Sequence, residues 1–157
     1  MTKELIQEYT LKITQANRSR IIVIVYDIAE QYIKDGLEAF DRGDLETFRD
    51  NCGYTLKCVG DLMEALDFSH ELAYPLMRLY QFISRQISLA SVKNDTEGLL
   101  TARGLLLSLR ESFEEVAKQD DSGPVMGNTE SVYAGLTYGR NSLNESINGS
   151  DNRGFMA

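Results

Sequence analysis

Ile21-Ile22-Val23-Ile24-Val25-Tyr26-Asp27 opens the first of four consecutive amphipathic segments that lie between Arg20 and Val116. In each segment apolar side chains recur every three or four residues, the spacing that lines them along one side of an α-helix. The second segment carries this pattern at Leu45, Phe48, Cys52, Leu56, Val59, Met63 and Leu66. No run alternates with the two-residue period of a β-strand. The sequence therefore predicts an all-α fold, an antiparallel four-helix bundle.

Local signals mark the ends of the first long helix, which we expect over about residues 18–42. Asn17 or Ser19 can cap its start, because either side chain can accept a hydrogen bond from a free backbone N–H. Gly43 ends it, and Asp44 caps the helix that follows. These signals predict a tight turn at residues 43–44 between two antiparallel helices.

Two further signals place the last two helices. Pro75 lacks a backbone donor, so the third long helix starts near it after a short turn, or it kinks there. Asn94 and Asp95 read as a tight turn and cap before the fourth long helix. The amphipathic pattern stops at Lys118.

The chain divides into three parts on this evidence. Residues 1–17 form an N-terminal arm or short helix, residues 18–119 the helical bundle, and residues 120–157 a linker and tail. The tail is rich in asparagine, serine and glycine, a composition that predicts largely irregular structure.

The first long helix carries apolar side chains on two faces. One stripe consists of Ile21, Val25, Ile28 and Tyr32, and the other of Ile22, Ile33 and Leu37. A helix with two apolar faces either sits centrally in its bundle or keeps one face for a partner.

The charge balance excludes several classes of ligand. The net charge is −8, which disfavours DNA, RNA and anionic membrane surfaces, because each needs a basic face. The first eight residues mix charges and lack the apolar core of a secretion signal, and no apolar run is long enough to span a membrane. Cys52 and Cys58 are too far apart on one helix for a disulfide, so we expect reduced, buried thiols and a cytoplasmic protein.

The residues offer no catalytic or metal-binding set. His70 is the single histidine, whereas a di-iron bundle needs two Glu-x-x-His pairs and a nucleophilic site needs a partnered base. The sequence therefore predicts no metal, no cofactor and no enzymatic activity.

A short stretch resembles a signalling module. Tyr54-Thr55-Leu56-Lys57 resembles the His-Thr-Leu-Lys stretch of histidine phosphotransfer domains, which are also four-helix bundles. Tyr54 stands where those domains carry the phosphorylated histidine, so that activity would be lost. A degenerate phosphotransfer domain, or another non-enzymatic signalling or adaptor bundle, is the alternative interpretation.

Several segments, in order, resemble the flagellin export chaperone (FliS) family. Ile22-Val23-Ile24-Val25-Tyr26-Asp27 resembles its Leu-x-x-x-Leu-Tyr-Asp helix start, and Leu79-Tyr80-Gln81-Phe82-Ile83 its Leu-Tyr-x-Tyr-Ile. Ser91-Val92-Lys93-Asn94-Asp95 resembles its turn before the last helix, and residues 107–113 its closing Leu-x-x-Leu-Arg-x-x-Trp, with Phe113 in place of the tryptophan.

The resemblance implies a helical bundle that binds the disordered C-terminal segment of flagellin, prevents its premature polymerisation and assists flagellar export. It also implies a contact with the export apparatus, and a homodimer is compatible with the sequence. The residues that the resemblance and the two apolar faces assign to partner binding are Tyr9, Ile13, Ile22, Tyr26, Tyr80 and Leu107.

The tail carries an apolar cluster of its own. Four large side chains stand close together behind the linker, at Val132, Tyr133, Leu136 and Tyr138. A purely solvating tail does not need them. Two interpretations are open: the tail is a disordered, solubilising segment, or, as we hypothesise, this cluster docks as a stand-in for flagellin in an apolar groove, of its own chain or of a neighbouring one.

Overall fold

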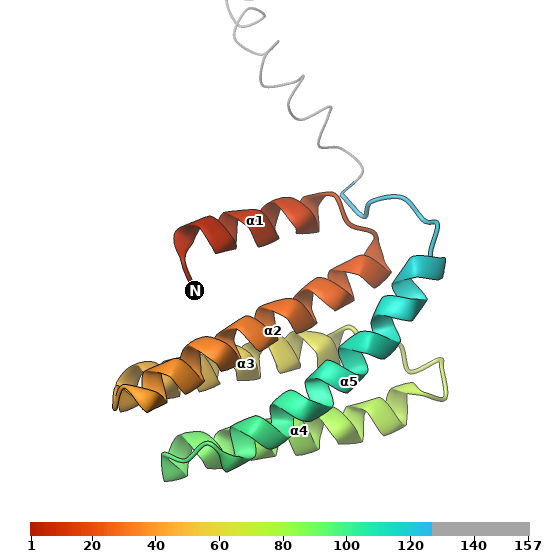
Figure 1. Ribbon diagram of the computed structural model, residues 1–157. Coiled ribbons are helices and arrows are strands. Elements are labelled where there is room, and N and C mark those ends of the chain that lie inside the picture. Colours follow the sequence, from red (N-terminus) through yellow and green to blue (C-terminus); the bar gives the residue numbers. More distant parts are fainter. Residues whose placement is uncertain (127–157) are drawn as a thin grey trace, which may run out of the picture. The chain divides into compact units, whose positions relative to one another are not determined.

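Five helices make up the part of the chain that the computed structural model describes, residues 1–126. They are α1 (Lys3–Thr14), α2 (Arg18–Asp41), α3 (Leu45–Glu64), α4 (Ala73–Lys93) and α5 (Glu97–Gln119). Helices α2 to α5 run antiparallel in chain order, and α1 lies along α2 (Figure 1). Within residues 1–126 no strand is present. The predicted all-α, four-helix bundle is confirmed for this part of the chain.

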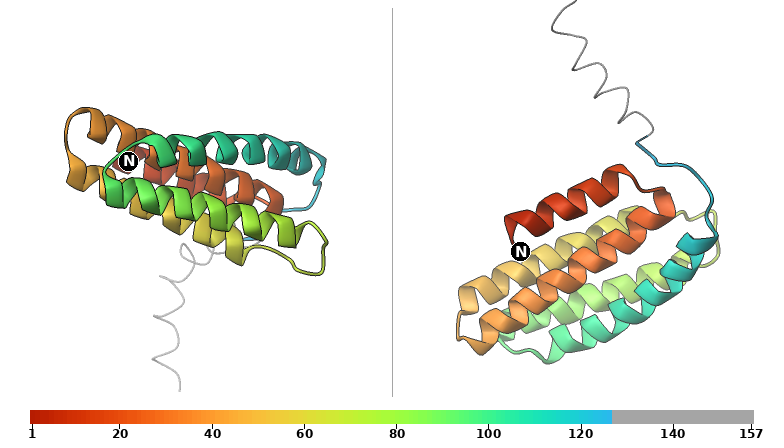
Figure 2. Two further views of the ribbon diagram at one scale, coloured as in Figure 1. Left: turned by 90° about the horizontal axis from the view of Figure 1, so that it is seen from below. Right: turned by 45° about the horizontal axis from the view of Figure 1, so that its top comes forward.

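The four long helices form a closed ring of neighbours. Helix α2 packs against α3 and α5, and α4 packs against the same two helices from the other side (Figure 2). The side chains that fill the centre come from all four helices: Tyr26, Ile33, Phe48, Leu62, Tyr80, Ile83, Ile87, Leu99 and Leu106. This burial of large apolar side chains is the main force that holds the ring together.

The predicted caps of α2 and α3 are confirmed. The Asn17 Oδ1 atom accepts a hydrogen bond from the Arg20 N–H at 2.8 Å, and Asp44 Oδ1 does the same for Thr47 N–H at 3.1 Å. Gly43 has a φ of 75°, a left-handed conformation that glycine adopts without strain. These local signals fix where the chain reverses between α2 and α3.

The predictions for the later turns are also confirmed. Helix α4 begins at Ala73, so Pro75 lies in its first turn, where the missing backbone donor costs little. Asn94 takes a left-handed φ of 53° and ends α4. Asp95 Oδ1 then accepts a hydrogen bond from Glu97 N–H at 3.2 Å as α5 starts.

The buried face of α3 differs from the predicted stripe. Phe48, Cys52 and Val59 are buried as expected, but Thr55 and Leu62 are buried too, while Leu56 and Met63 are only half-buried. Helix α3 packs between α2 and α4, so its core-facing side is centred between two neighbours rather than on one straight seam.

Both cysteines are free and buried in the bundle, as the sequence predicts. Burial raises the pKa of the Cys52 thiol to about 11 and that of the Cys58 thiol to about 12. Both groups are therefore protonated at neutral pH and serve as small apolar side chains.

Residues 120–125 fold back onto the junction between α1 and α2. Asn17 Nδ2 donates hydrogen bonds to the carbonyl oxygens of Asp120 and Ser122, at 3.0 and 3.2 Å. The Val125 N–H donates to the Ala16 carbonyl oxygen at 3.1 Å. Hydrogen bonds from Ser122 and Ser19 lower the pKa of the Asp120 carboxyl to about 2. One asparagine thus caps α2 and holds the segment that follows α5.

Candidate functional site

An apolar groove opens at the end of the bundle where α3 ends, α4 begins and α5 ends. Its volume is about 590 Å³. We call it the bundle-end groove. Leu66 and Leu72 line it from the connection between α3 and α4, Leu76 and Leu79 from α4, and Phe113 and Val116 from α5. The volume lies in the range of sites that receive a ligand or several side chains of a partner.

The rim of the groove exposes large apolar side chains to solvent. Leu72 is 73% exposed and Val116 is 55% exposed. Close by in the chain, the rings of Phe68 and Tyr74 meet edge to face with centroids 5.2 Å apart, and both are exposed. Contiguous exposed apolar side chains of this kind mark surfaces that contact other proteins.

A few polar groups lie at the edge of the groove. The His70 Nε2 atom is 3.8 Å from Asp67 Oδ2, and the His70 side chain is largely exposed. A hydrogen bond from Ser69 lowers the pKa of the Asp67 carboxyl. The groove is therefore an apolar channel with exposed apolar side chains at its rim and a few polar groups at one edge, a surface suited to an amphipathic segment rather than to a small charged ligand.

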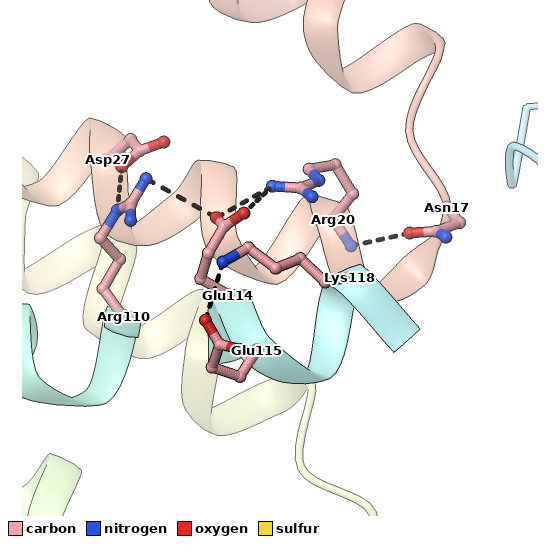
Figure 3. A network of polar contacts seen from close by, with 7 residues as sticks. All are labelled: Asn17, Arg20, Asp27, Arg110, Glu114, Glu115 and Lys118. Carbon is pink, nitrogen blue, oxygen red and sulfur yellow. Dashed lines mark hydrogen bonds and ion pairs between the residues drawn. The ribbon is translucent and has the colours of Figure 1, made fainter. Parts of the chain in front are cut away.

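Ion pairs join α2 to α5, the helix whose C-terminal part lines the groove (Figure 3). The Arg20 guanidinium donates to both carboxylate oxygens of Glu114 at 2.9 Å, and Arg110 Nε donates to Asp27 Oδ1 at 2.6 Å. The bond from Arg20 lowers the pKa of the Glu114 carboxyl. These pairs tie α5 to α2, and α5 also presents Phe113 and Val116 to the groove.

The comparison with known families fits this architecture. The family model described as "Flagellar protein FliS" matches residues 1–120. The chain belongs to the FliS family. It is also similar to the "Flagellar secretion chaperone FliS" of Bacillus subtilis (strain 168), with 19% identity over 108 residues, which cover 69% of this chain and 81% of that relative. The match ends at residue 120, so the FliS region contains all five helices.

The residues predicted to bind a partner do not form one patch in this FliS bundle. Tyr26 and Tyr80 are buried inside the ring of helices, and burial raises the pKa of both hydroxyls. Tyr26 nevertheless reaches the bundle-end groove indirectly, because its ring packs against Phe113 with centroids 5.5 Å apart. A role in partner contact remains a prediction for both tyrosines, whose side chains lie in the bundle core.

The other predicted residues are half-buried or exposed. Tyr9 and Ile13 are half-buried on α1, and the Tyr9 hydroxyl donates to the Asp27 carbonyl oxygen at 3.5 Å. Ile22 packs half-buried against the core, and Leu107 is 37% exposed on α5. Helix α1 itself has no fully buried residue, so its attachment to α2 is shallow.

Sequence reasoning missed the groove as a site, although its parts carried a signal. Leu72 and Val116 stand at the ends of the apolar stripes at residues 72–90 and 99–116, and both are exposed. The four predicted tail residues, Val132, Tyr133, Leu136 and Tyr138, lie outside the described residues.

Two further properties concern residues 1–126 only. No group of three or more histidine, cysteine, aspartate or glutamate side chains there is placed to hold a metal ion. None of the five helices combines the length and the apolar character that a membrane-spanning helix needs.

Proposed function

We propose that the protein is a cytoplasmic secretion chaperone that binds the disordered C-terminal segment of flagellin. In this role it keeps flagellin from polymerising early and presents it to the flagellar export apparatus. Membership of the FliS family and the name of the Bacillus subtilis relative support the chaperone role. The observation that carries flagellin binding is the bundle-end groove, an apolar channel with exposed leucine and valine side chains at its rim.

The groove suits a segment that folds as it binds. An amphipathic helix recognises such a channel by seating apolar side chains at intervals of three and four residues. Ordering a disordered segment costs about 2–5 kcal/mol. Fully burying one leucine-sized side chain contributes about 1.5–3 kcal/mol, so two or three seated side chains offset that cost.

The proposed work is binding and not catalysis. The buried thiols of Cys52 and Cys58 are protonated at neutral pH because their pKa values are about 11 and 12. His70 is exposed, and its neighbour in the structure is the Asp67 carboxylate rather than a nucleophile. A chaperone of this kind needs only a surface that its client covers.

Titration calorimetry with a peptide of the flagellin C-terminal segment tests the proposal. We expect binding with a negative heat-capacity change, since apolar surface is buried. Leu72→Asn and Val116→Asn should each weaken binding by about tenfold, which corresponds to roughly 1.4 kcal/mol. Both side chains are exposed, so neither change should unfold the bundle.

Leu100→Asn is the matched control, because Leu100 is 48% exposed on α5 and does not line the groove. Its affinity should stay within about twofold of the native value, as for surface changes away from a contact. The proposal fails if the native chain does not bind the peptide. Groove binding fails if the groove variants bind as tightly as the control.

A further inference from the structure

Helix α4 carries a second stripe on the side that faces away from the bundle core. Its buried stripe consists of Tyr80, Ile83, Ile87 and Ala90. The outer stripe repeats at the same intervals of three and four residues, and every member is exposed: Tyr74, Arg78, Phe82, Arg85, Leu89 and Val92. We call this set the α4 outer stripe. Periodic exposed apolar side chains on one helix face are the pattern that docks another helix.

The α4 outer stripe is basic in an otherwise acidic protein. The chain has a net charge of −8, yet α4 contains Arg78, Arg85 and Lys93 and not one aspartate or glutamate. The other four helices of residues 1–126 all contain carboxylates. Among these five helices, α4 alone therefore carries cations without carboxylates.

The cations of the stripe have no acidic partner among the described residues. Arg20, Arg103 and Arg110 all pair with carboxylates across the α2–α5 seam. Arg78 and Arg85 form no ion pair within residues 1–126. Asp95 and Glu97 follow closely after Lys93, so its charge is partly offset. Arg78 and Arg85 are thus the two cations of the α4 outer stripe that are free to meet a partner.

The apolar members of the stripe are also unusual for a solvent-facing helix side. Phe82 is 46% exposed, and Leu89 and Val92 follow it at intervals of seven and three residues on the same side. This side differs from the bundle-end groove, which α4 lines with Leu76 and Leu79 on the side facing α5. The two surfaces are neighbours on α4 but can be changed separately.

We propose that the α4 outer stripe docks an amphipathic helix of a partner protein whose apolar side is flanked by carboxylates. The apolar side of that helix covers Phe82 and Leu89, and its carboxylates meet Arg78 and Arg85. Charge complementarity selects this partner, because an acidic helix is attracted to the stripe and a basic one is repelled from it.

Two other occupants fit the stripe less well. A second copy of this chain would bring another net charge of −8, and no other described helix is free of carboxylates. An anionic membrane surface would attract two or three cations on α4 but repel the acidic remainder, and stable surface binding needs a larger basic cluster. Both occupants are outcomes that the experiment separates.

The test uses the full chain and two synthetic helical peptides. Both peptides carry leucine at alternating intervals of three and four residues; one has glutamate at every flanking position and the other has lysine. We expect fluorescence anisotropy to show binding of the glutamate peptide only, weakening as salt rises. Arg85→Glu should lower its affinity by about fivefold to tenfold, and Phe82→Ser by about tenfold.

Lys3→Glu is the matched control, since Lys3 is exposed on α1, forms no ion pair within residues 1–126 and undergoes the same charge reversal. It should leave the affinity within about twofold. Equal binding of both peptides, binding of neither, or equal effects of Arg85→Glu and Lys3→Glu would overturn the proposal.

If the proposal fails, two parallel measurements show which of the other two occupants binds the α4 outer stripe. Sedimentation with phosphatidylserine vesicles that depends on Arg85, without glutamate-peptide binding, would assign the stripe to a membrane surface. A dimer that Arg85→Glu dissociates would assign it to a second copy. Leu72→Asn leaves the stripe intact, so loss of flagellin-peptide binding in that variant reports on the proposed chaperone function alone.

Discussion

The hydroxyl oxygens of Tyr26 and Tyr80 lie 2.5 Å apart in the interior of the bundle, so that one hydroxyl donates a hydrogen bond to the other. Tyr26 belongs to α2 and Tyr80 to α4, which occupy opposite corners of the ring of helices. The Tyr26 ring also packs on Phe113 at the wall of the bundle-end groove. The pair therefore fixes the distance across the bundle next to the groove.

A double-mutant cycle should show that these two hydroxyls depend on each other. Tyr80→Phe leaves the Tyr26 hydroxyl buried without a partner, which costs about 1–3 kcal/mol of unfolding free energy. Tyr26→Phe should cost a similar amount, because Tyr80 is equally buried. The double variant should lose less than the sum of the two, since no polar group is then left unpaired. Urea unfolding measures all three, and strictly additive losses would contradict the hydrogen bond.

The same pair should make the protein sensitive to alkaline pH. Burial raises the pKa of both hydroxyls above the ordinary value of about 10. The unfolded chain therefore releases these protons first, so their contribution to stability is complete below pH about 10 and falls as pH rises above it. The double Tyr→Phe variant should show a shallower loss over that range. The native protein and the double variant share the buried thiols, so the thiols cancel in the difference between their stabilities. If the unfolding free energies of the two proteins fall in parallel as pH rises, the tyrosine pair is not the cause of the alkaline sensitivity.

Local signals in the sequence predicted the helix ends, because each depends on a few neighbouring residues. Asn17, Gly43, Asp44 and Asn94 act through their own backbone or side chain within one turn. The helical period was equally readable. The buried side of α3 could not be predicted from the sequence, because it depends on how α3 packs against its two neighbours, α2 and α4.

The candidate site was harder to predict from the sequence, because it too depends on how the helices pack together. A tyrosine is equally suited to a core and to an interface, and only the arrangement of α2 and α4 places Tyr26 and Tyr80 inside. The bundle-end groove forms only when two stretches that are distant in sequence, residues 65–79 and 109–116, come together. The unpaired state of Arg78 and Arg85 likewise depends on which carboxylates surround them after folding.

Glu114 should contribute more to stability than its neighbour Glu115. Glu114 accepts two hydrogen bonds from Arg20 across the α2–α5 seam, and its side chain is only 20% exposed. Glu115 pairs with Lys118 on the same helix, and both side chains are well exposed. Glu114→Ala should lower the unfolding free energy by up to about 1 kcal/mol and Glu115→Ala by a few tenths at most. If both variants lose the same unfolding free energy in thermal or urea unfolding, the ion pair between α2 and α5 contributes no more to stability than the exposed pair within α5.

Gly98 should be the least replaceable glycine of α5, because α4 and α5 meet there backbone to backbone. A Cβ atom at Gly98 would lie 2.3 Å from the Gln86 carbonyl oxygen, a distance that only a separation of the two helices can relieve. Gly98→Ala should therefore destabilise the bundle by about 1–3 kcal/mol, as overpacking does. Gly104→Ala is the matched control on the same helix, since a Cβ there meets nothing within 4 Å. The control should stabilise the protein by up to about 1 kcal/mol, because alanine favours the helix over glycine. Urea unfolding of the two variants should thus change in opposite directions, and a gain in stability from Gly98→Ala would mean that α4 and α5 do not approach as closely as described.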